Sequence, residues 1–247
     1  MRFPGIARWL VAVSAVGVLT AAAAQAPRWL RRSDAFRVRR VDVVGTRYTE
    51  PQKVLAASGI GRGASIFDDP APWRARLLQL PLVTNVEIER RLPAAIVIRI
   101  TEAEPVALAR TPDLVPVDAR GAVLVVPQGT DLDLPVLGVG ARVGADGRLA
   151  DPVAVGMAGT LDRIRALEPA LAAQVSEARP AGGGGVLLVL RQAGFVASVA
   201  AEPTAASLEH LRAALADVAA RGELPRLRAI DARFADQIVV AFNPSRP

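Results

Sequence analysis

The stretch that decides the fold is "VTNVEIERRLPAAIVIRITEAEPVALA", which covers residues 83–109. Apolar and polar residues alternate on both sides of a short Arg-Arg-Leu-Pro break, and a period of two is typical of β-strands joined by a turn. The apolar face of the predicted hairpin consists of Val86, Ile88, Ile96, Ile98 and Ile100. A two-stranded hairpin is at best marginally stable in water, so this face must pack on other elements.

The preceding residues supply those elements. Val41 and Val43 alternate with Asp42 in a predicted strand that ends at Gly45. Thr49 is a predicted N-cap for a helix that stops at Gly59, and a second helix precedes Pro81. The order strand, helix, helix, strand, strand predicts a small α+β domain with two helices on one face of its sheet. We expect the hairpin to pack on Val54, Leu55, Trp73 and Leu77.

The composition bounds the class of protein. The 247 residues are 51% apolar and 22% charged, which excludes a disordered chain and a multi-span membrane protein. Cysteine is absent and His210 is the single histidine, which excludes thiol nucleophiles and zinc sites built from several Cys or His ligands. The net charge is +6, but aromatic residues make up only 4%, which disfavours the base-stacking surfaces of single-strand nucleic-acid binders. We therefore expect no nucleic-acid partner.

An uncharged run near the N-terminus, "WLVAVSAVGVLTAAAAQA" (Trp9–Ala26), has two interpretations. It is about 18 residues long, near the lower limit for a helix that spans a bilayer. Ala24-Gln25-Ala26 resembles a signal-peptidase site, but Pro27 would follow the cut, and Trp29 extends the apolar character. We favour the interpretation in which residues 9–30 form an uncleaved signal anchor that lies in the lipid bilayer.

Charges around this run bear on topology. A cluster of arginines follows the run and consists of Arg28, Arg31, Arg32, Arg37, Arg39 and Arg40. We interpret it as a membrane-proximal surface, with residues 31–37 as a basic linker. By the positive-inside rule this cluster would place the C-terminal part in the cytoplasm. The short N-terminal flank resembles an export signal, so we instead expect residues 1–8 to be a cytoplasmic tail.

The C-terminal part of the sequence predicts a second α+β domain. Leucine-rich stripes at helical spacing indicate two helices. Their members are Leu161, Ile164, Leu167 and Leu171 in the first, and Leu208, Leu211, Leu215 and Val218 in the second. "GVLLVLRQAGFVASVA" and the terminal "DQIVVAF" alternate like strands. We expect a mostly antiparallel sheet that ends in a C-terminal edge strand.

The sequence contains no recognisable catalytic, cofactor or metal motif. "AGGGG" at residues 181–185 lacks the Lys-Ser/Thr of a phosphate loop. His210 has no nucleophile or orienting partner that the sequence identifies, so we interpret it as a surface residue of a helix. We expect a protein without catalytic activity, which acts through its strand edges, since these can accept a partner strand.

The first domain resembles the POTRA domain of the FtsQ/DivIB cell-division family. The resemblance rests on "VRRVDVVGTRYTEPQKVLAASGI" and on the hairpin pattern. The matching hairpin positions are Pro81, Val83, Val86, Ile88, Arg90, Pro93, Ile98, Ile100, Glu102, Pro105, Val106 and Ala107. The resemblance implies a POTRA domain at residues 38–104 and a β domain of the FtsQ type at residues 105–243, followed by a tail at residues 244–247.

The β domain resembles the same family in "LVPVDARGAVLVV", "LPVLG" and "AIDARFADQIVVAF". Phe234, Gln237 and Phe242 stand where the family has Tyr, Gly and Trp. The resemblance implies that the last strand receives a partner protein by strand addition. The implied contact residues are Arg233, Phe234, Ile238, Val239, Val240, Ala241 and Phe242.

The resemblance also implies a biological role. It predicts a bitopic scaffold of the bacterial divisome at the septum, in the inner membrane, with its C-terminal bulk in the periplasm. Its partners would be FtsB- and FtsL-like single-pass proteins, with other divisome members bound by the POTRA domain. An exported POTRA-containing factor for outer-membrane assembly or secretion is the alternative. It would need further POTRA repeats or a barrel, for which the sequence gives no signal.

Overall fold

The computed structural model describes residues 34–127, 129–191, 194–234 and 237–243. The predicted anchor 9–30, both predicted tails, and Arg28, Arg31 and Arg32 lie outside the described residues. Within the described ranges, no helix has the length and apolar character needed to cross a membrane. The chain divides into two compact units, the first ending at Glu102 and the second beginning at Ala103.

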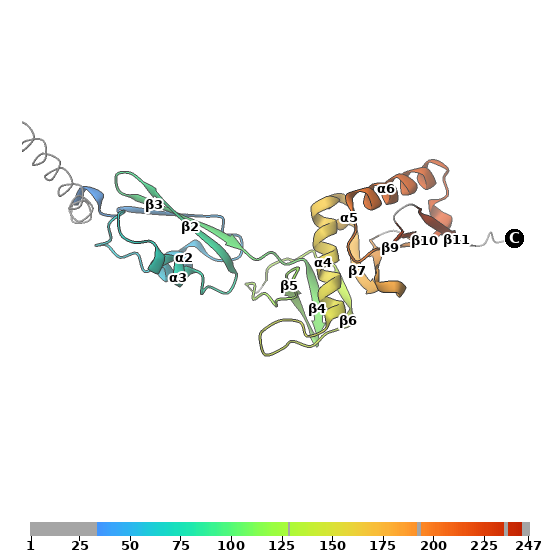
Figure 1. The fold of residues 1–247 in the computed structure, drawn as a ribbon, viewed down its shortest axis with the longest axis horizontal. Coiled ribbons are helices and arrows are strands. Elements are labelled where there is room, and N and C mark those ends of the chain that lie inside the picture. Colours follow the sequence, from blue (N-terminus) through green and yellow to red (C-terminus); the bar gives the residue numbers. More distant parts are fainter. Residues whose placement is uncertain (1–33, 128, 192–193, 235–236, 244–247) are drawn as a thin grey trace, which may run out of the picture. The chain divides into compact units, whose positions relative to one another are not determined.

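The first unit has the predicted order of elements. They are η1 (Asp34–Phe36), β1 (Arg40–Val44), α2 (Pro51–Ser58), α3 (Ala71–Leu77), β2 (Val83–Arg91) and β3 (Ala95–Glu102). The sheet order is β1-β3-β2, with β1 parallel and β2 antiparallel to β3. Both helices lie on one face of this sheet (Figure 1). The β-α-α-β-β arrangement predicted for the POTRA module is confirmed.

The core of the first unit forms where the isoleucines of β3 meet the two helices. Ile96 and Ile98 are fully buried and Ile100 nearly so, each contributing about 1.5–3 kcal/mol of hydrophobic stabilisation. Val54, Trp73 and Leu77 pack against them, as predicted. The prediction for Leu55 was wrong: its side chain is 41% exposed, because α2 turns Val54 and Ser58 to the sheet instead.

The loop between β1 and α2 is fixed by one carboxylate. Glu102, the last residue of β3, accepts hydrogen bonds from the backbone N–H groups of Arg47, Tyr48 and Thr49 at 2.7–2.8 Å. Thr49 was predicted to be the N-cap of α2. The helix instead begins at Pro51 with Glu50 at the cap position, and no side-chain bond closes it. The chain is positioned here by the long-range contact to Glu102 rather than by a local cap.

The second unit has a larger sheet. Its elements are β4 (Ala107–Thr111), β5 (Asp113–Val117), β6 (Val136–Gly140), α4 (Pro152–Leu167), α5 (Pro169–Ala172), β7 (Val175–Pro180), η2 (Gly182–Gly184), β8 (Val186–Leu190), β9 (Val196–Val199), α6 (Ala205–Ala220), η3 (Leu224–Arg226), β10 (Leu227–Ala232) and β11 (Val239–Phe242). Eight strands are ordered β11-β10-β9-β8-β7-β6-β4-β5, which places β11 at one edge.

The sheet is mixed: four of its seven strand pairs are antiparallel, so the expected antiparallel majority holds narrowly. The pairs β4–β6, β6–β7 and β9–β10 are parallel. Two of these pairs are joined through helices, β6–β7 by α4 and α5, and β9–β10 by α6. A helical crossover returns the chain to the start of the neighbouring strand, so the two strands run the same way.

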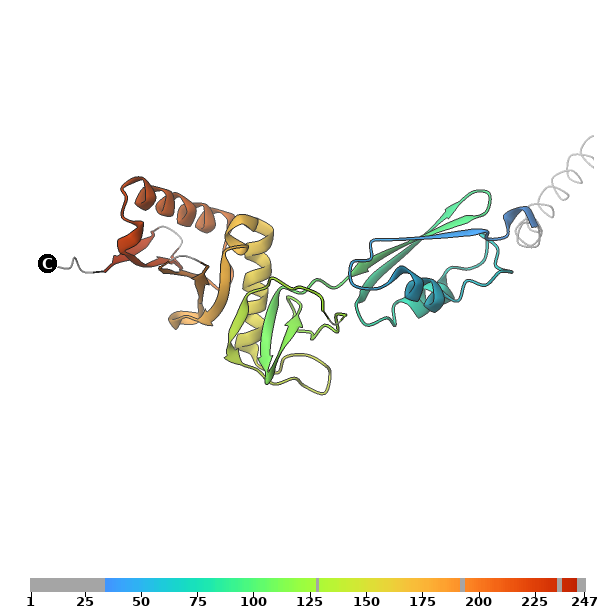
Figure 2. The same cartoon turned by 180° about the vertical axis from the view of Figure 1, so that it is seen from behind.

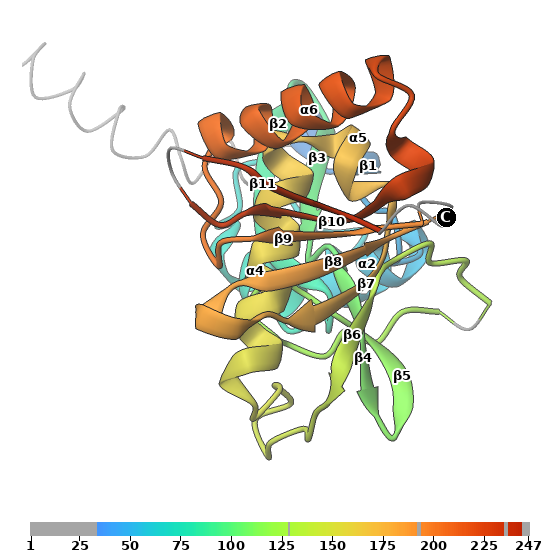
Figure 3. The same cartoon turned by 90° about the vertical axis from the view of Figure 1, so that its right-hand side faces the viewer.

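The long helices of this unit cover a single face of its sheet. In Figure 3, α4 runs behind β7–β9 and α6 runs along the side of β10 and β11. The burial of β8 alternates accordingly: Val186, Leu188 and Leu190 are buried, whereas Leu187 and Val189 are half-buried. Of the described helices of this unit, none covers the face that carries Leu187 and Val189 (Figure 3), which we name the open face.

Candidate functional site

The free edge of β11 presents main-chain groups that β10 does not use. β11 pairs only with β10 in the described sheet, antiparallel and in the register Val240 to Ile230. Just past the strand, the N–H of Asn243 donates to the carbonyl of Arg226 at 2.8 Å. Because successive residues of a strand point their polar groups to opposite sides, the N–H and C=O of Phe242 and Val240 face away from β10.

The side chains of β11 divide as the period of two predicts. Val240 packs against the core, as does Ile238 just before the strand, and Phe242 is half-buried with the Arg226 guanidinium 6.0 Å from its ring centre. On the other side, Val239 is 49% exposed and Ala241 is exposed. The edge therefore combines free hydrogen-bonding groups with an apolar side chain on the open face.

Arg233 and Phe234 directly follow β10, at the end of that strand where β11 begins. The Arg233 guanidinium pairs with Asp231 at 2.6 Å and donates to the carbonyl of Gly182 in η2. Hydrogen bonding to Arg233 holds the pKa of Asp231 below its ordinary value, and the same pair raises the pKa of Arg233. Phe234 is 43% exposed, with the Arg233 guanidinium 6.0 Å from its ring centre. An aromatic ring is thus available to a partner next to a fixed charge.

The strand register places a second ion pair, Glu177–Arg179 on β7, in the same cross-strand rows as β11, and sequence reasoning did not identify it. One row of partners crosses the open face through Arg179, Leu187, Ser198, Asp231 and Val239. The neighbouring row runs through Glu177, Val189, Val196, Ala229 and Ala241. Five strands at about 4.8 Å spacing make each row about 19 Å wide. Half-buried apolar side chains therefore lie between β11 and a charged pair on β7.

The pair on β7 is an ordinary ion pair in its chemistry. Arg179 and Glu177 lie 2.7 Å apart, and the hydrogen bond from Arg179 lowers the pKa of Glu177. Both side chains are partly exposed. The only sequence signal is their i, i+2 spacing in a strand, which places them on one face but does not identify that face.

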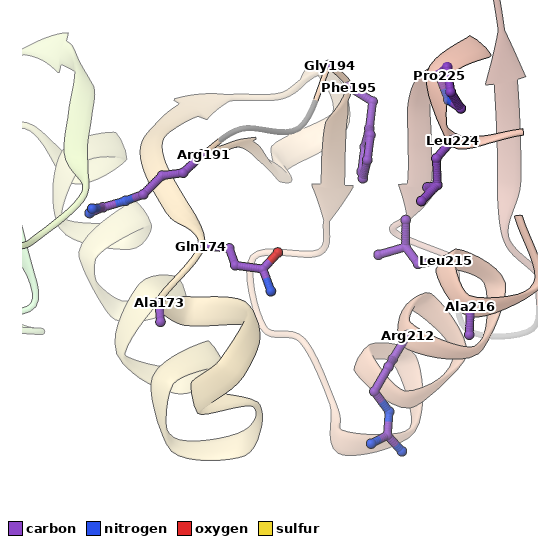
Figure 4. A pocket seen from close by; sticks show the side chains of 10 residues that line it. All are labelled: Ala173, Gln174, Arg191, Gly194, Phe195, Arg212, Leu215, Ala216, Leu224 and Pro225. Atoms are coloured by element: carbon purple, nitrogen blue, oxygen red, sulfur yellow. The ribbon is translucent and has the colours of Figure 1, made fainter. Parts of the chain in front are cut away.

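A cleft of about 900 Å³ lies between α5, α6 and η3, near the ends of β8 and β9. Figure 4 shows Phe195, Leu215 and Leu224 pointing toward one another, with the Gln174 amide between the helices. None of the ten lining residues carries a carboxylate, hydroxyl, thiol or imidazole. The cleft can accept an apolar group but supplies no nucleophile or general base.

The remaining predicted residues belong to other elements of the fold. Arg37 pairs with Asp34 at 2.6 Å, Arg40 pairs with Asp42 at 2.7 Å, and Arg39 is exposed. His210 is exposed on α6. Among the described residues, no group of three or more His, Cys, Asp or Glu side chains is arranged to hold a metal ion.

Comparison with known proteins identifies the first unit. Residues 36–103 match the family model described as "POTRA domain, FtsQ-type". This match confirms the resemblance that the hairpin pattern indicated. The matched residues also contain every element of the first unit from β1 to β3.

Relatives with one shared name match a larger part of the chain. "Cell division protein FtsQ" of Syntrophotalea carbinolica is 32% identical over 129 residues, 51% of this chain and 46% of that protein. The protein of that name in Novosphingobium aromaticivorans is 32% identical over 206 residues, 81% of this chain and 59% of the relative. The one in Geotalea daltonii is 25% identical over 218 residues, 83% of this chain and 75% of the relative.

The extent of these matches differs between relatives. The chain spans about half the length of the Syntrophotalea relative and of the Anaeromyxobacter relative, at 46% and 48%. The longer matches extend well beyond the POTRA domain.

Proposed function

We propose that this chain, a homologue of proteins named cell division protein FtsQ with an FtsQ-type POTRA domain, is a non-catalytic scaffold of the bacterial divisome. It recruits and links other division proteins at the septum. It is bitopic in the inner membrane, with residues 1–8 cytoplasmic, residues 9–30 as anchor and residues 31–37 as linker. The POTRA domain, residues 38–104, and the β domain, residues 105–243, lie in the periplasm, followed by the tail 244–247.

Strand addition at β11 is the proposed mechanism. The observation that carries it is the free edge of β11, where Val240 and Phe242 direct main-chain groups away from β10. A partner strand would take these hydrogen bonds, which supply affinity, while side chains supply selection. Val239 and Ala241 are exposed on β11 and Phe234 is exposed in the segment that precedes it, as selection requires.

The partners we propose are FtsB- and FtsL-like single-pass division proteins at β11, and other divisome members at the POTRA domain. Arg233 and Arg179 are both on or beside the open face that continues from β11. They favour a partner that carries carboxylates next to its added strand, because arginine pairs bidentately with carboxylates. On binding, Arg233 and Arg179 would exchange their present partners, Asp231 and Glu177, for carboxylates of the partner protein.

A binding titration tests this proposal. The full-length protein in nanodiscs is titrated with the extracytoplasmic segment of the FtsB-like protein from the same organism. We expect Phe234→Ala to weaken binding about tenfold, the loss typical of an interfacial aromatic residue.

The control variant is Val125→Ala, whose side chain is 72% exposed elsewhere in the same unit. It should bind like the wild type. Wild-type affinity in the Phe234→Ala variant, with an unchanged circular dichroism spectrum, would contradict binding at this edge.

A further inference from the structure

The turn between β2 and β3 carries an unusually exposed leucine. Leu92 is 72% exposed at the end of the hairpin, between Arg91 and Pro93. It makes no contribution to the core of the first unit. We name residues 91–94 the hairpin tip. An apolar side chain flanked by a cation can enter a lipid interface while the cation stays at the headgroups.

The described chain enters the first unit at this same end. The N–H groups of Arg39 and Arg40 donate to the carbonyl of Ala94, at 2.8 and 3.3 Å. Arg40 is also the register partner of Ala95, which in turn pairs with Arg91. Figures 1 and 2 show the tip beside η1, the first described element. Leu92 and the entry of the chain are therefore neighbours.

Positive charge exceeds negative charge around the tip. The arginines there are Arg37, Arg39, Arg40, Arg62, Arg90 and Arg91, and the nearby carboxylates are Asp34, Asp42, Asp68 and Glu89. Three of the carboxylates pair with arginines: Asp34 with Arg37, Asp42 with Arg40, and Glu89 with Arg91.

The remaining arginines keep their charge available. Arg90 donates to the carbonyls of Ile66 and Asp68, which do not neutralise it. Arg39 and Arg62 are exposed and form no ion pair with any described residue. An anionic surface would thus meet unneutralised guanidinium groups next to Leu92.

The sequence places a bilayer near this end. The predicted anchor ends at Leu30 and η1 begins at Asp34, so the intervening chain can reach at most about 14 Å. The electrostatic attraction extends about one Debye length, roughly 8–10 Å, so the arginines act on the bilayer surface when the intervening chain is less than fully extended.

We propose that the hairpin tip is a membrane-contact site, in which Leu92 enters the interface of the bilayer and Arg39 and Arg62 bind anionic phospholipid headgroups. The inference rests on the membrane anchoring in the proposed function. It adds a second point of contact, which would fix how the POTRA domain stands on the membrane. A protein partner at the same tip is the competing occupant.

The absence of cysteine makes the site directly measurable. The full-length Leu92→Cys variant is labelled with an environment-sensitive fluorophore and reconstituted in nanodiscs that contain phosphatidylglycerol and a lipid-borne quencher. The matched control is Leu78→Cys. Leu78 is 42% exposed and follows α3 before β2 begins at Val83, toward the opposite end of the sheet.

We expect the label at residue 92 to be quenched at least about twofold more than the label at residue 78. The difference should disappear in discs of phosphatidylcholine alone, and when Arg39→Glu and Arg62→Glu are added. Arg212 is an exposed arginine of α6, and Arg212→Glu should leave the difference in quenching unchanged. Equal quenching at residues 92 and 78 would overturn the membrane contact.

The outcomes separate this inference from the proposed function. A chain that incorporates into discs but shows no quenching at residue 92 is anchored without the tip contact, so only the inference fails. A chain that does not incorporate into discs contradicts both. A blue shift at residue 92 without lipid quenching, seen only when a division protein is added, would assign the tip to a protein partner and overturn the lipid contact.

Discussion

Glu102 is one side chain that holds two distant segments of the POTRA domain together. Its carboxylate accepts three successive backbone N–H groups, from residues 47–49, across more than 50 positions of sequence. Partial burial raises the pKa of Glu102, but the hydrogen bonds from Thr49, Tyr48 and Arg47 outweigh it and hold the pKa below its ordinary value. The bonds therefore stabilise the ionised form, and with it the folded state.

We predict that Glu102→Gln lowers the free energy of unfolding of the POTRA domain by about 1–2 kcal/mol at neutral pH, since an amide oxygen replaces a charged acceptor. A carboxyl whose folded pKa is depressed adds stability above its unfolded pKa and loses it as pH falls through the folded value. The difference between wild type and variant should thus shrink below about pH 4. Urea unfolding at neutral pH and near pH 3 measures it.

Glu87→Gln is the matched control for this residue. Glu87 is exposed on the other face of the sheet, 3.7 Å from Arg99. Glu87→Gln should lower the free energy of unfolding only slightly, because exposed ion pairs contribute little stability. Equal losses in the two variants, or a Glu102→Gln loss independent of pH, would contradict the proposed role of Glu102.

At the scale of elements, strand β11 allows its two sides to be tested separately. The N–H of Val240 faces the free edge, and the N–H of Ala241 faces β10, by the alternation that starts from Asn243. We predict that Val240→Pro abolishes measurable partner binding while the thermal midpoint stays within a few degrees, since proline is tolerated at sheet edges. Ala241→Pro should lower the midpoint as well, because it removes a bond to β10.

Calorimetry and the binding titration together check this prediction. The contrast between two adjacent positions is the control, since both variants introduce the same ring into the same strand. If Val240→Pro keeps its affinity, main-chain pairing at the free edge is not the basis of recognition. If both variants lose stability equally, the assignment of the two sides of β11 is wrong.

The elements differ in how far the sequence predicted them. The faces of β3 and β11 followed from a period of two, because burial of alternate residues leaves a local pattern. Leu55 was misassigned, since Val54 and Leu55 are both apolar and only packing decides which one α2 buries. The parallel pairs were also missed, although the leucine stripes were visible, the first of which the structure divides between α4 and α5. The direction of a strand depends on the crossover, not on its own residues.

The candidate site shows the same limit at a longer range. Arg233 and Phe234 could be proposed because "AIDARFADQIVVAF" resembles the pattern of the family. Arg179 could not, because its relation to Val239 exists only in the register of five strands. Local patterns therefore predict elements and edges, whereas the composition of the open face requires the folded sheet.

At the scale of the whole molecule, each unit has a core of its own. The core of the first unit contains Ile98 and Trp73, and the core of the second contains Ile164 and Leu188. Units that bury separate cores unfold as separate cooperative transitions when those cores dominate their stability. The sequence offers a convenient reporter, because Trp73 is the one tryptophan outside the N-terminal segment.

We predict two separable transitions in urea for the full chain with Trp9→Phe and Trp29→Phe. Trp73 is 7% exposed in the first core, so its fluorescence reports that unit, whereas circular dichroism is dominated by α4 and α6 of the second. Ile98→Val and Ile164→Val are matched changes at fully buried positions, each expected to cost about 0.5–1.5 kcal/mol. Ile98→Val should shift the fluorescence transition alone, and Ile164→Val the dichroism transition alone. Coincident transitions that both variants shift together would instead establish one cooperative molecule, in which partner binding at β11 could alter the stability of the POTRA domain directly.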